Sequence, residues 1–301
     1  MEQNQVITKD EFIGFYEPLL KGYSETFKHD IASLDILSDI LFAKNEQITI
    51  IEIQSFLENQ TDAHIKSLLY RLLGTREILF CRDNDLQLDV KNVWRLISKS
   101  IRVISSSYTI SSIGSQGFLS IPLFKNDETL ESFDFLRLHI WDDSLDKFMD
   151  LQKVEDFSIH SHTFFARSWV LTGKIINDRF EFIKDSDKAK HSFFKVVYND
   201  SLNEVNQHTS KAVNENIDAE LIKVSEEVHH EMAVYEIKPS KLHKSGHKNS
   251  PNCSATFFSF TGKDGLGESF VIGPKHIKES EVNRKMNISP IYLLDKIDSQ
   301  L

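Results

Sequence analysis

Cysteine is nearly absent from the 301-residue sequence, and glycine and proline are scarce. The two cysteines, Cys81 and Cys253, lie far apart and form no Cys-x-x-Cys pair, which excludes a disulfide framework and a zinc knuckle. The small numbers of Gly, 11, and Pro, 6, exclude collagen-like and low-complexity architectures. We therefore expect a folded globular protein in a reducing compartment, the cytoplasm.

Long apolar runs are also missing. No stretch approaches the roughly 18 consecutive apolar residues that a transmembrane helix needs. The first residues, Met1–Gln5, lack the basic and apolar blocks of a signal peptide. These absences predict that the protein does not insert into a membrane, which agrees with the expected cytoplasmic location.

An excess of positive charge is the third absence. The chain has 35 Lys and Arg against 45 Asp and Glu, a formal net charge of −10, of which residues 1–110 carry −4 and residues 111–301 carry −6. Binding to nucleic acid by counterion release requires clustered Lys and Arg. The negative net charge therefore disfavours a protein that coats nucleic acid, although a local cluster of basic residues remains compatible with it.

The sequence is instead rich in apolar and aromatic residues, with 40% hydrophobic residues and 22 Phe. This is enough for a large core, in one large domain or two ordinary ones. Two patterns divide the chain. Helical spacing dominates residues 1–110 and strand alternation dominates residues 118–290, with the polar stretch Ser105–Gly117 between them. We therefore predict an α+β protein with a helical N-terminal domain and an all-β second domain.

The helical part has three sets of apolar residues at helical spacing. The third helix has N-cap candidates at residues 59–62 and is predicted to stop at Gly74. After it, residues 77–80 and 86–90 alternate around a turn at residues 83–85, which predicts a small hairpin. The three apolar sets are Leu34, Ile36, Leu37, Ile40 and Leu41, then Ile50, Ile51, Ile53, Phe56 and Leu57, and then Ile65, Leu68, Leu69, Leu72 and Leu73.

Three helices followed by a hairpin resemble a winged helix-turn-helix over residues 31–90. The resemblance implies that the third helix enters a DNA major groove. The side chains that it would present are His64, Lys66, Ser67, Tyr70 and Arg71. Because their basic content is modest, nucleic-acid binding is not favoured, and a protein-binding module or a plain helical cap explains the same pattern.

Many short alternating strands with turn signals are predicted in the second part, which is typical of a β-barrel or β-sandwich. One turn is expected inside the second of these segments, at Asn177–Asp178. The predicted strands are residues 136–141, 164–172, 174–183, 193–198, 219–224, 232–237, 255–260 and 270–272.

Just before the strand predicted at residues 164–172, the sequence has a histidine pair at alternate positions, His160 and His162. Alternate residues of a strand lie roughly 6.5–7 Å apart with both side chains on one face. Two imidazoles placed in this way can bind one metal ion at about 2.1 Å. Solvent-facing polar residues are the alternative, but Ile159, Phe164 and Phe165 surround the pair with apolar side chains. The pair is therefore a candidate metal site.

The segment Phe157–Gly173 resembles the first metal motif of the cupin superfamily, and its Ile-His-x-His-Thr opening resembles the cysteine-dioxygenase branch. A second half-motif at Val234–His243 follows in the same order, with a Pro-containing turn before His243. The resemblance covers residues 133–273. It implies a cupin barrel, a double-stranded β-helix, with His160, His162 and His243 as metal ligands and Gly173 as a turn.

The resemblance also implies the metal and the reaction. Many cupins have a fourth ligand, a glutamate, where this sequence has Arg167, which leaves three histidines and favours the thiol-dioxygenase type of site. The implied cofactor is Fe(II) or another divalent transition metal, with one side open for O₂ and a small anionic substrate. No cysteine near the first motif matches the Cys–Tyr crosslink of some dioxygenases.

Further residues are candidates for the same pocket. Arg167 or Arg137 could bind a substrate carboxylate in bidentate fashion, although a structural ion pair explains Arg167 equally well. His139 faces the same side as Arg137 and could line the pocket or serve a structural role. His247 is an alternative third ligand. The run His229–Glu231 is interpreted as a solvent-exposed segment that leads into a strand rather than as a ligand set, because adjacent strand residues face opposite sides.

Other chemistries lack their motifs. The Gly262–Gly267 segment has glycines but no following helix to bind a phosphate, and the sequence has no Gly-x-Ser-x-Gly or His-Glu-x-x-His motif. Trp141 and Trp169 are predicted to pack in the core. The first hypothesis is a metal-dependent cupin oxygenase. A winged-helix and cupin ligand-sensing regulator and a non-catalytic interaction protein are the alternatives, and the oligomeric state is open.

Overall fold

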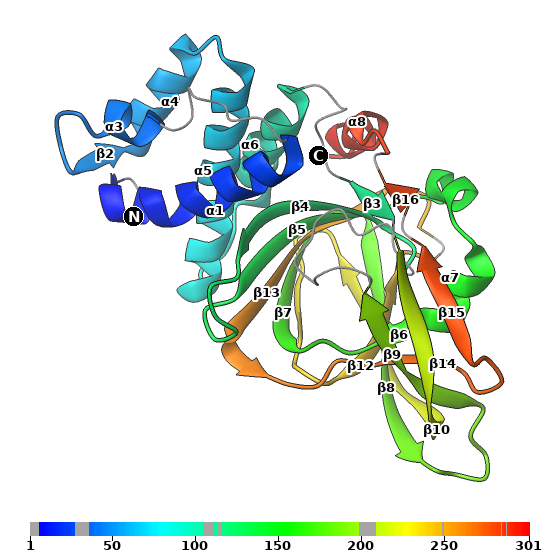
Figure 1. Ribbon diagram of the computed structural model, residues 1–301. Coiled ribbons are helices and arrows are strands. Elements are labelled where there is room, and N and C mark those ends of the chain that lie inside the picture. Colours follow the sequence, from blue (N-terminus) through cyan, green and yellow to red (C-terminus); the bar gives the residue numbers. More distant parts are fainter. Residues whose placement is uncertain are drawn as a thin grey trace. The chain divides into compact units, whose positions relative to one another are not determined.

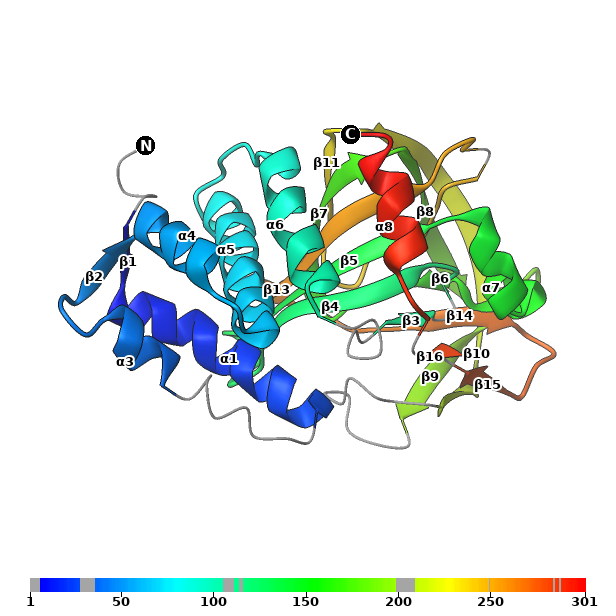
Figure 2. The ribbon, with the colours of Figure 1, turned by 90° about the horizontal axis from the view of Figure 1, so that it is seen from above.

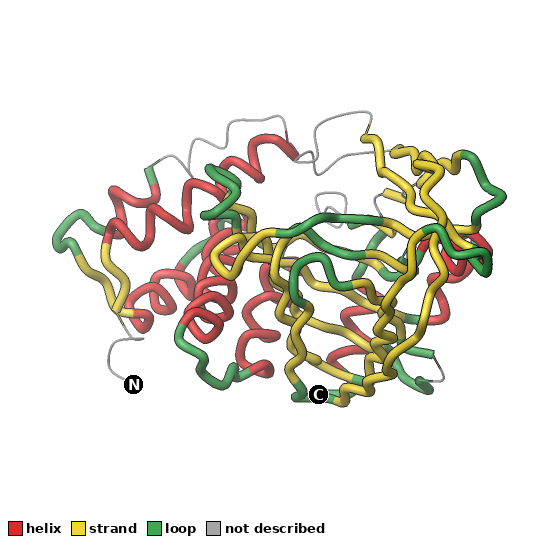
Figure 3. Tube along the Cα trace, turned by 90° about the horizontal axis from the view of Figure 1, so that it is seen from below, coloured by secondary structure: helices red, strands yellow, loops and turns green. Residues whose placement is uncertain are grey.

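The computed structural model divides the chain into two compact units. The first comprises residues 1–109 with 123–125, and the second comprises residues 110–122 with 126–301. Helices dominate the first unit and strands the second, so the predicted α+β class is confirmed (Figure 3). The structure describes residues 6–27, 36–104, 111–113, 116–198, 209–248, 250–283, 285–286 and 288–301. Leu34 and most of Ser105–Gly117 lie outside these residues.

The first unit is a set of helices with a two-stranded sheet, β1 (Val6–Thr8) paired with β2 (Gln47–Thr49). Side-chain caps begin its longer helices. Thr49 and Glu52 form a capping box, and the Asp62 carboxylate accepts hydrogen bonds from the amides of His64 and Ile65. The described helices are α1 (Lys9–Phe27), α3 (Leu37–Leu41), α4 (Ile50–Asn59), α5 (Ala63–Asp83) and α6 (Val90–Arg102).

The predicted hairpin of the winged-helix pattern was wrong. Residues 77–83 continue α5, because Ile78 and Leu79 lie on its buried side. Val90 opens α6, whose first turn is capped by the Asp89 carboxylate. The alternation of apolar and polar residues at positions 77–80 and 86–90 therefore comes from the end of α5, a short loop and the start of α6.

Gly74 does not end α5, as the sequence predicted, but lets α5 and α6 approach closely (Figure 2). A Cβ atom at Gly74 would lie 2.7 Å from Ile97 Cδ1. The hydroxyl of Ser67, two turns earlier, donates a 2.6 Å hydrogen bond to the Ser100 carbonyl of α6. The glycine is thus required for space between helices.

We expect Gly74→Ala to lower the free energy of unfolding by about 1–3 kcal/mol, because overpacking at a tight helix contact costs about that much. Urea denaturation followed by circular dichroism measures the change. Gly14→Ala in α1 is the matched control, since nothing lies within 4 Å of its added methyl group. That variant should gain roughly 0.5–1 kcal/mol from helix propensity. A Gly74→Ala protein as stable as the control would contradict the packing.

Among its described residues, the second unit contains two seven-stranded sheets, whose strands are labelled in Figure 1. The first sheet has the strand order β11-β7-β13-β5-β4-β3-β16. Its long neighbouring strands β5, β7 and β13 pair in antiparallel fashion. The strands of the first sheet are β3 (Ser112–Ile113), β4 (Leu119–Asn126), β5 (Asp134–Trp141), β7 (Phe164–Thr172), β11 (Val234–Ile237), β13 (Ser254–Leu266) and β16 (Lys285–Met286).

The second sheet has the order β15-β10-β8-β12-β6-β14-β9. Its 22-residue strand β10 pairs with β9 over its first half and with β8 over its second half, and both partners meet at Ala219. The strands of the second sheet are β6 (Ile159–His160), β8 (Lys174–Lys184), β9 (His191–Tyr198), β10 (Thr209–His230), β12 (Leu242–Gly246), β14 (Val271–Pro274) and β15 (Glu279–Asn283).

Helical segments also occur in the second unit, so the prediction of an all-β domain over residues 118–290 was wrong in this respect. They are the 3₁₀ helix η3 (Asp143–Phe148), α7 (Leu151–Phe157) and α8 (Ile291–Asp298). The Lys296 ammonium of α8 bonds both oxygens of the buried Asp142 carboxylate, at 2.8 and 2.7 Å. None of the described helices is long and apolar enough to cross a membrane.

The predicted strands are confirmed in position, except that residues 232–233 form a turn before β11 and Phe270 precedes β14, and the turn at Asn177–Asp178 was wrong. Both residues lie within β8, where Asn177 pairs with Glu227 of β10. The Asn177 side chain is fully buried and accepts a 2.5 Å hydrogen bond from the Ser245 hydroxyl, which favours the strand over a turn. The chain turns instead at Asp185, whose φ is 53°.

A core lies between the facing surfaces of the two sheets. It joins side chains of β5, β7, β11 and β13 to Ile175 of β8. Trp141 belongs to this core, and Trp169 is equally buried at 3% exposure, which confirms that both tryptophans pack. Gly173 links β7 to β8 with a φ of 73°, as the sequence predicted for a turn. The same space between the sheets holds the candidate site.

Candidate metal centre

Three histidines from neighbouring strands meet on one face of the second sheet. His160 ends β6, His162 follows two residues later, and His243 lies in β12, paired in register with His160. Side chains of directly paired residues lie on the same face of a sheet. Strand pairing therefore brings together residues that are 83 positions apart in the sequence.

Ser161, between the two ligand candidates, anchors the segment. Its hydroxyl donates to the Glu268 carbonyl at 3.0 Å and accepts from the Phe270 amide at 2.9 Å. The carbonyl of His162 accepts a 2.9 Å hydrogen bond from the Ser240 amide, just before β12. Because adjacent residues of an extended chain face opposite sides, the anchor and the histidines do not compete for space.

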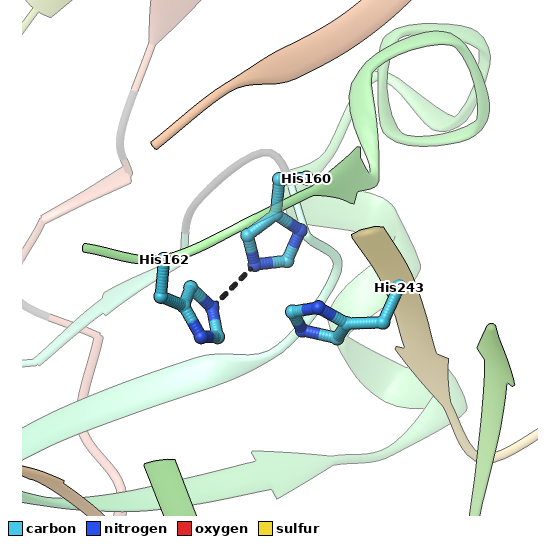
Figure 4. A group of neighbouring side chains, drawn as sticks. All are labelled: His160, His162 and His243. Carbon is cyan, nitrogen blue, oxygen red and sulfur yellow. Dashed lines mark hydrogen bonds between the residues drawn. The ribbon is translucent and has the colours of Figure 1, made fainter. Parts of the chain in front are cut away.

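The three imidazoles point toward one another (Figure 4). Their ring centroids are 4.4–4.8 Å apart. One nitrogen from each ring lies within 4.8 Å of the other two, and this is the only such group of three or more His, Cys, Asp or Glu among the described residues. The structure thus brings together the three residues that the sequence proposed as ligands.

Backbone carbonyls orient two of the rings. His160 Nδ1 lies 2.8 Å from the Ser158 carbonyl oxygen, and His243 Nδ1 lies 3.2 Å from the Lys241 carbonyl oxygen. A carbonyl only accepts, so each Nδ1 carries the proton and each Nε2 keeps its lone pair. Metal-binding histidines are held in this way by an outer partner that fixes the tautomer.

The spacing of two nitrogens suits one metal ion. His160 Nε2 and His162 Nε2 are 2.9 Å apart. Two nitrogens that each lie about 2.1 Å from a metal and subtend about 90° are about 3.0 Å apart. The donor set therefore fits a divalent transition metal with cis imidazole ligands, and imidazole suits Fe, Zn, Cu and Ni.

The site disfavours protonated imidazole. Burial is the main cause that lowers the pKa of His160, His162 and His243, well below the usual value for the latter two. Charge repulsion among the rings adds to the effect on His162 and His243. Neutral imidazole is the form that binds metal, so the protein keeps these ligands ready near neutral pH.

The rings also retain accessible surface. His243 is buried, but His160 and His162 are each partly accessible, although burial dominates the pKa of both. Phe260 and Phe258 of β13 border His162, with ring centroids 4.6 and 6.0 Å from its own. Aromatic side chains therefore border the three-histidine group.

Arg137 and His139 lie on the facing sheet, on the same side of β5. The His139 ring stacks on Phe258 at 4.7 Å between centroids, and Phe258 in turn borders His162. Burial, followed by the charges of Arg137 and His160, lowers the pKa of His139 well below its usual value. Arg137 and His139 thus share one face of β5, as the strand alternation predicted, and His139 lies near the three histidines.

Arg167 is not part of this interior. It lies between Ala166 and Ser168 of β7, and Ala166 belongs to the core between the sheets, so Arg167 faces the other side. Its guanidinium forms an ion pair with Glu236, the residue opposite it on β11, at 2.6 Å. The predicted carboxylate-binding role therefore has no geometric support, and the ion-pair alternative describes the residue.

The remaining histidine candidates lie elsewhere. His247 Nε2 is 3.4 Å from an Asp143 carboxylate oxygen at the start of η3, so it is not the third ligand. His229 and His230 are the last residues of β10 rather than a lead-in to a strand. His229 stacks on Tyr235, with centroids 4.5 Å apart.

Sequence reasoning missed Arg179, which pairs in register with His243 from the neighbouring strand β8. Arg179 Nε and Nη2 donate to a Glu227 carboxylate oxygen at 3.0 and 2.8 Å, and Nη2 also donates to the Glu236 carbonyl at 2.9 Å. Its charge contributes to lowering the pKa of His162 and His243. The incorrect turn at Asn177–Asp178 concealed the strand alternation that would have identified it.

Comparisons with known proteins give little further information. No protein-family model and no curated protein matches the sequence. Among solved structures, the Fe(II) form of HppE matches with a TM-score of 0.25 and 13% identity, over 82% of this chain and 97% of that chain. Hydroxypropylphosphonic acid epoxidase from S. wedmorenis matches with a TM-score of 0.24 and 13% identity, over 82% and 96%. At these TM-scores the likeness assigns neither fold nor function.

Proposed function

We propose that the second unit is a cupin-type, metal-dependent oxygenase that binds Fe(II) through His160, His162 and His243. The observation that carries the proposal is the convergence of three neutral imidazoles, two of them with Nδ1 held by backbone carbonyls. The pairing order of the two sheets is compatible with a double-stranded β-helix. We also propose residues 1–110 and 118–290 as separate domains.

Fe(II) held by three histidines supplies, when bound, the redox chemistry for a reaction between O₂ and a substrate at adjacent open positions. The protein contributes the surroundings. Phe258 and Phe260, which border His162, exclude bulk water from the site. The carbonyls of Ser158 and Lys241 hold the Nδ1 protons and thereby prevent the rings from turning.

We propose that the substrate is a small anionic molecule and that Arg137 contributes to its binding. Arg137 lies on the same side of β5 as His139, and its guanidinium carbon is 4.8 Å from the centroid of the Phe135 ring. A guanidinium has a donor geometry that suits a carboxylate. A thiolate is the preferred group for the metal side, because a soft anionic donor completes a site of neutral imidazoles.

Anaerobic reconstitution with iron, followed by metal analysis and an oxygen-electrode screen with small thiols, tests the proposal. We expect one iron per chain and consumption of one O₂ per thiol, since converting a thiol to a sulfinic acid inserts both oxygen atoms, RSH + O₂ → RSO₂H. A wild-type protein that retains less than stoichiometric metal would contradict the proposed metal site. A metal-loaded protein that consumes no O₂ with any thiol would remove the thiol-oxygenase function.

A further inference from the structure

The most exposed side of helix α6 carries only positive charge. Three residues of α6 are exposed, and all three are basic: Lys91, Arg95 and Lys99. They are four residues apart, so they form one row, about 12 Å long, on the same side of the helix. The opposite side of α6 is apolar and buried, with Val93, Trp94, Ile97 and Ile101. The row is therefore the part of α6 that other molecules can reach.

Such a row is unfavourable for an isolated helix. Basic side chains four residues apart repel each other, and solvated helix faces usually combine both signs of charge. Lys91 lies in the first turn, where the helix dipole disfavours a cation. Solubility does not require the row either, because the chain has a net charge of −10. These unfavourable features indicate that the row serves the binding of a negatively charged partner.

Helix α5 adds to this positive side. The two helices lie side by side (Figure 2), and the Lys99 ammonium is 5.4 Å from the centroid of the Tyr70 ring of α5. Lys66, one turn before Tyr70, is on the same side of α5 and is partly exposed. Arg71 Nε donates a 3.5 Å hydrogen bond to the Ser100 hydroxyl of α6. Cations from the first half of α5 therefore lie beside the last turns of α6.

The two helices separate charge within residues 1–110. Residues 63–71 and 90–102 contain six of the 12 Lys and Arg of this part and none of its 16 Asp and Glu. Their formal charge is +6, whereas the other residues of 1–110 carry −10. The acidic N-caps Asp62 and Asp89 accept hydrogen bonds from amides in the first turns of α5 and α6. We call the six basic side chains the basic patch: Lys66, Arg71, Lys91, Arg95, Lys99 and Arg102.

The basic patch fits a phosphate backbone. Contacts to DNA phosphates come from Arg and Lys together with hydroxyl and amide side chains, and Tyr70 and Asn92 lie beside cations of the patch. Double-stranded DNA carries one negative charge per about 1.7 Å of its axis, so a row of about 12 Å spans several phosphates. A membrane surface fits less well, because the apolar side of α6 is buried and cannot insert.

We propose that the basic patch binds the phosphate backbone of double-stranded DNA. The inference goes beyond the proposed function and does not depend on the metal centre. It differs from the winged-helix expectation, in which the third helix alone enters the groove, because α6 contributes four of the six cations. Ser67, which that expectation placed at the DNA, is buried and donates to the Ser100 carbonyl. The negative charge elsewhere in the chain weakens the binding, which therefore requires low salt.

Fluorescence anisotropy of a labelled duplex of about 20 base pairs, titrated with the full chain at salt concentrations from about 50 to 200 mM, tests the proposal. We expect binding at the lowest salt concentration. The logarithm of the binding constant should fall with the logarithm of the salt concentration with a slope of about −4 to −5, since each neutralised phosphate contributes about −0.9. Arg95→Gln and Lys99→Gln should each make the slope less steep by about 0.9 and weaken binding by about 10-fold at the lowest salt.

Lys44→Gln is the matched control, because Lys44 is also exposed in the first unit but lies outside the basic patch, between α3 and β2. It removes the same charge and should leave both the slope and the affinity unchanged. Polyglutamate should compete poorly with the duplex, because it carries one charge per about 3.3 Å of extended chain. Failure to bind the duplex at the lowest salt, or equal effects of Lys44→Gln and Lys99→Gln, would overturn the proposal. Polyglutamate that competes as well as unlabelled duplex at equal total charge would overturn it in favour of an acidic protein as the partner.

Discussion

Replacing His243 with alanine is expected to lower the affinity for Fe(II) or Co(II) by more than about 100-fold. Loss of an outer partner of a metal ligand costs about 10- to 100-fold, and loss of the ligand itself should cost more. His243 is 2% exposed, so water cannot readily replace the missing imidazole without reorganising the site. Isothermal titration with Co(II) under anaerobic conditions measures the affinity, and metal analysis gives the stoichiometry.

His139→Ala is the matched control for this experiment. His139 is also buried, at 6% exposure, and lies on the facing sheet, but it is outside the group of three converging nitrogens. Both substitutions remove a buried ring of the same size, so they share the cost of a cavity. We expect His139→Ala to retain one metal ion per chain. Equal loss of metal in the two variants, or full binding by His243→Ala, would contradict the assigned ligands.

The metal-free protein is expected to lose stability steeply as the pH falls from about 6.5 to 5.5. Burial lowers the pKa of His139, His162 and His243 well below the unfolded value of about 6.5. The unfolded chain therefore takes up protons first, and the stability present above pH 6.5 is lost on acidification. Each histidine that stays neutral in the folded state contributes about 1 kcal/mol over this unit of pH, or about 3 kcal/mol for the three.

Urea denaturation of the metal-free protein at a series of pH values measures this loss. His139→Phe keeps an aromatic ring in the stack with Phe118 and Phe258 but removes the titratable group. Its loss of stability between pH 6.5 and 5.5 should be smaller than that of the wild type by about 1 kcal/mol. A free energy of unfolding that is flat over this range would mean that the histidines become protonated without cost in the folded protein.

The ligand candidates could be predicted from the sequence because strand alternation is a local property. His160 and His162 share a face by their spacing alone. Placing His243 opposite them required the register between β12 and β6, which involves residues far apart in the chain. The resemblance to a known metal motif supplied that register. Arg167 failed because its position in the motif suggested a pocket residue, whereas the alternation along β7 directs it away.

The errors in the helical unit have a different cause. Glycine at position 74 is a common signal for the end of a helix, yet here the absence of a side chain serves contact with Ile97 of another helix. The residues after it alternate in polarity, and a short helical turn can imitate such alternation. Asn177 was misread in a similar way, because an Asn-Asp pair favours turns unless a buried partner such as Ser245 satisfies the side chain.

The pairing of β10 with both β8 and β9 has a consequence for association between chains. A strand at the edge of a sheet offers unpaired amide and carbonyl groups to other molecules, which is a common route to aggregation. Strands β10, β8, β12, β6, β14 and β9 pair in sequence, and β9 pairs again with β10, so these six form a closed circuit. Ile222 and Val224 are exposed on β10, but they lie in the stretch paired with β8. Over residues 220–230, however, β8 is the one partner of β10 among the described residues, because the pairing with β9 ends at Ala219. The other backbone edge of this stretch, which carries exposed β-branched side chains, is therefore open to pairing with a strand of another chain.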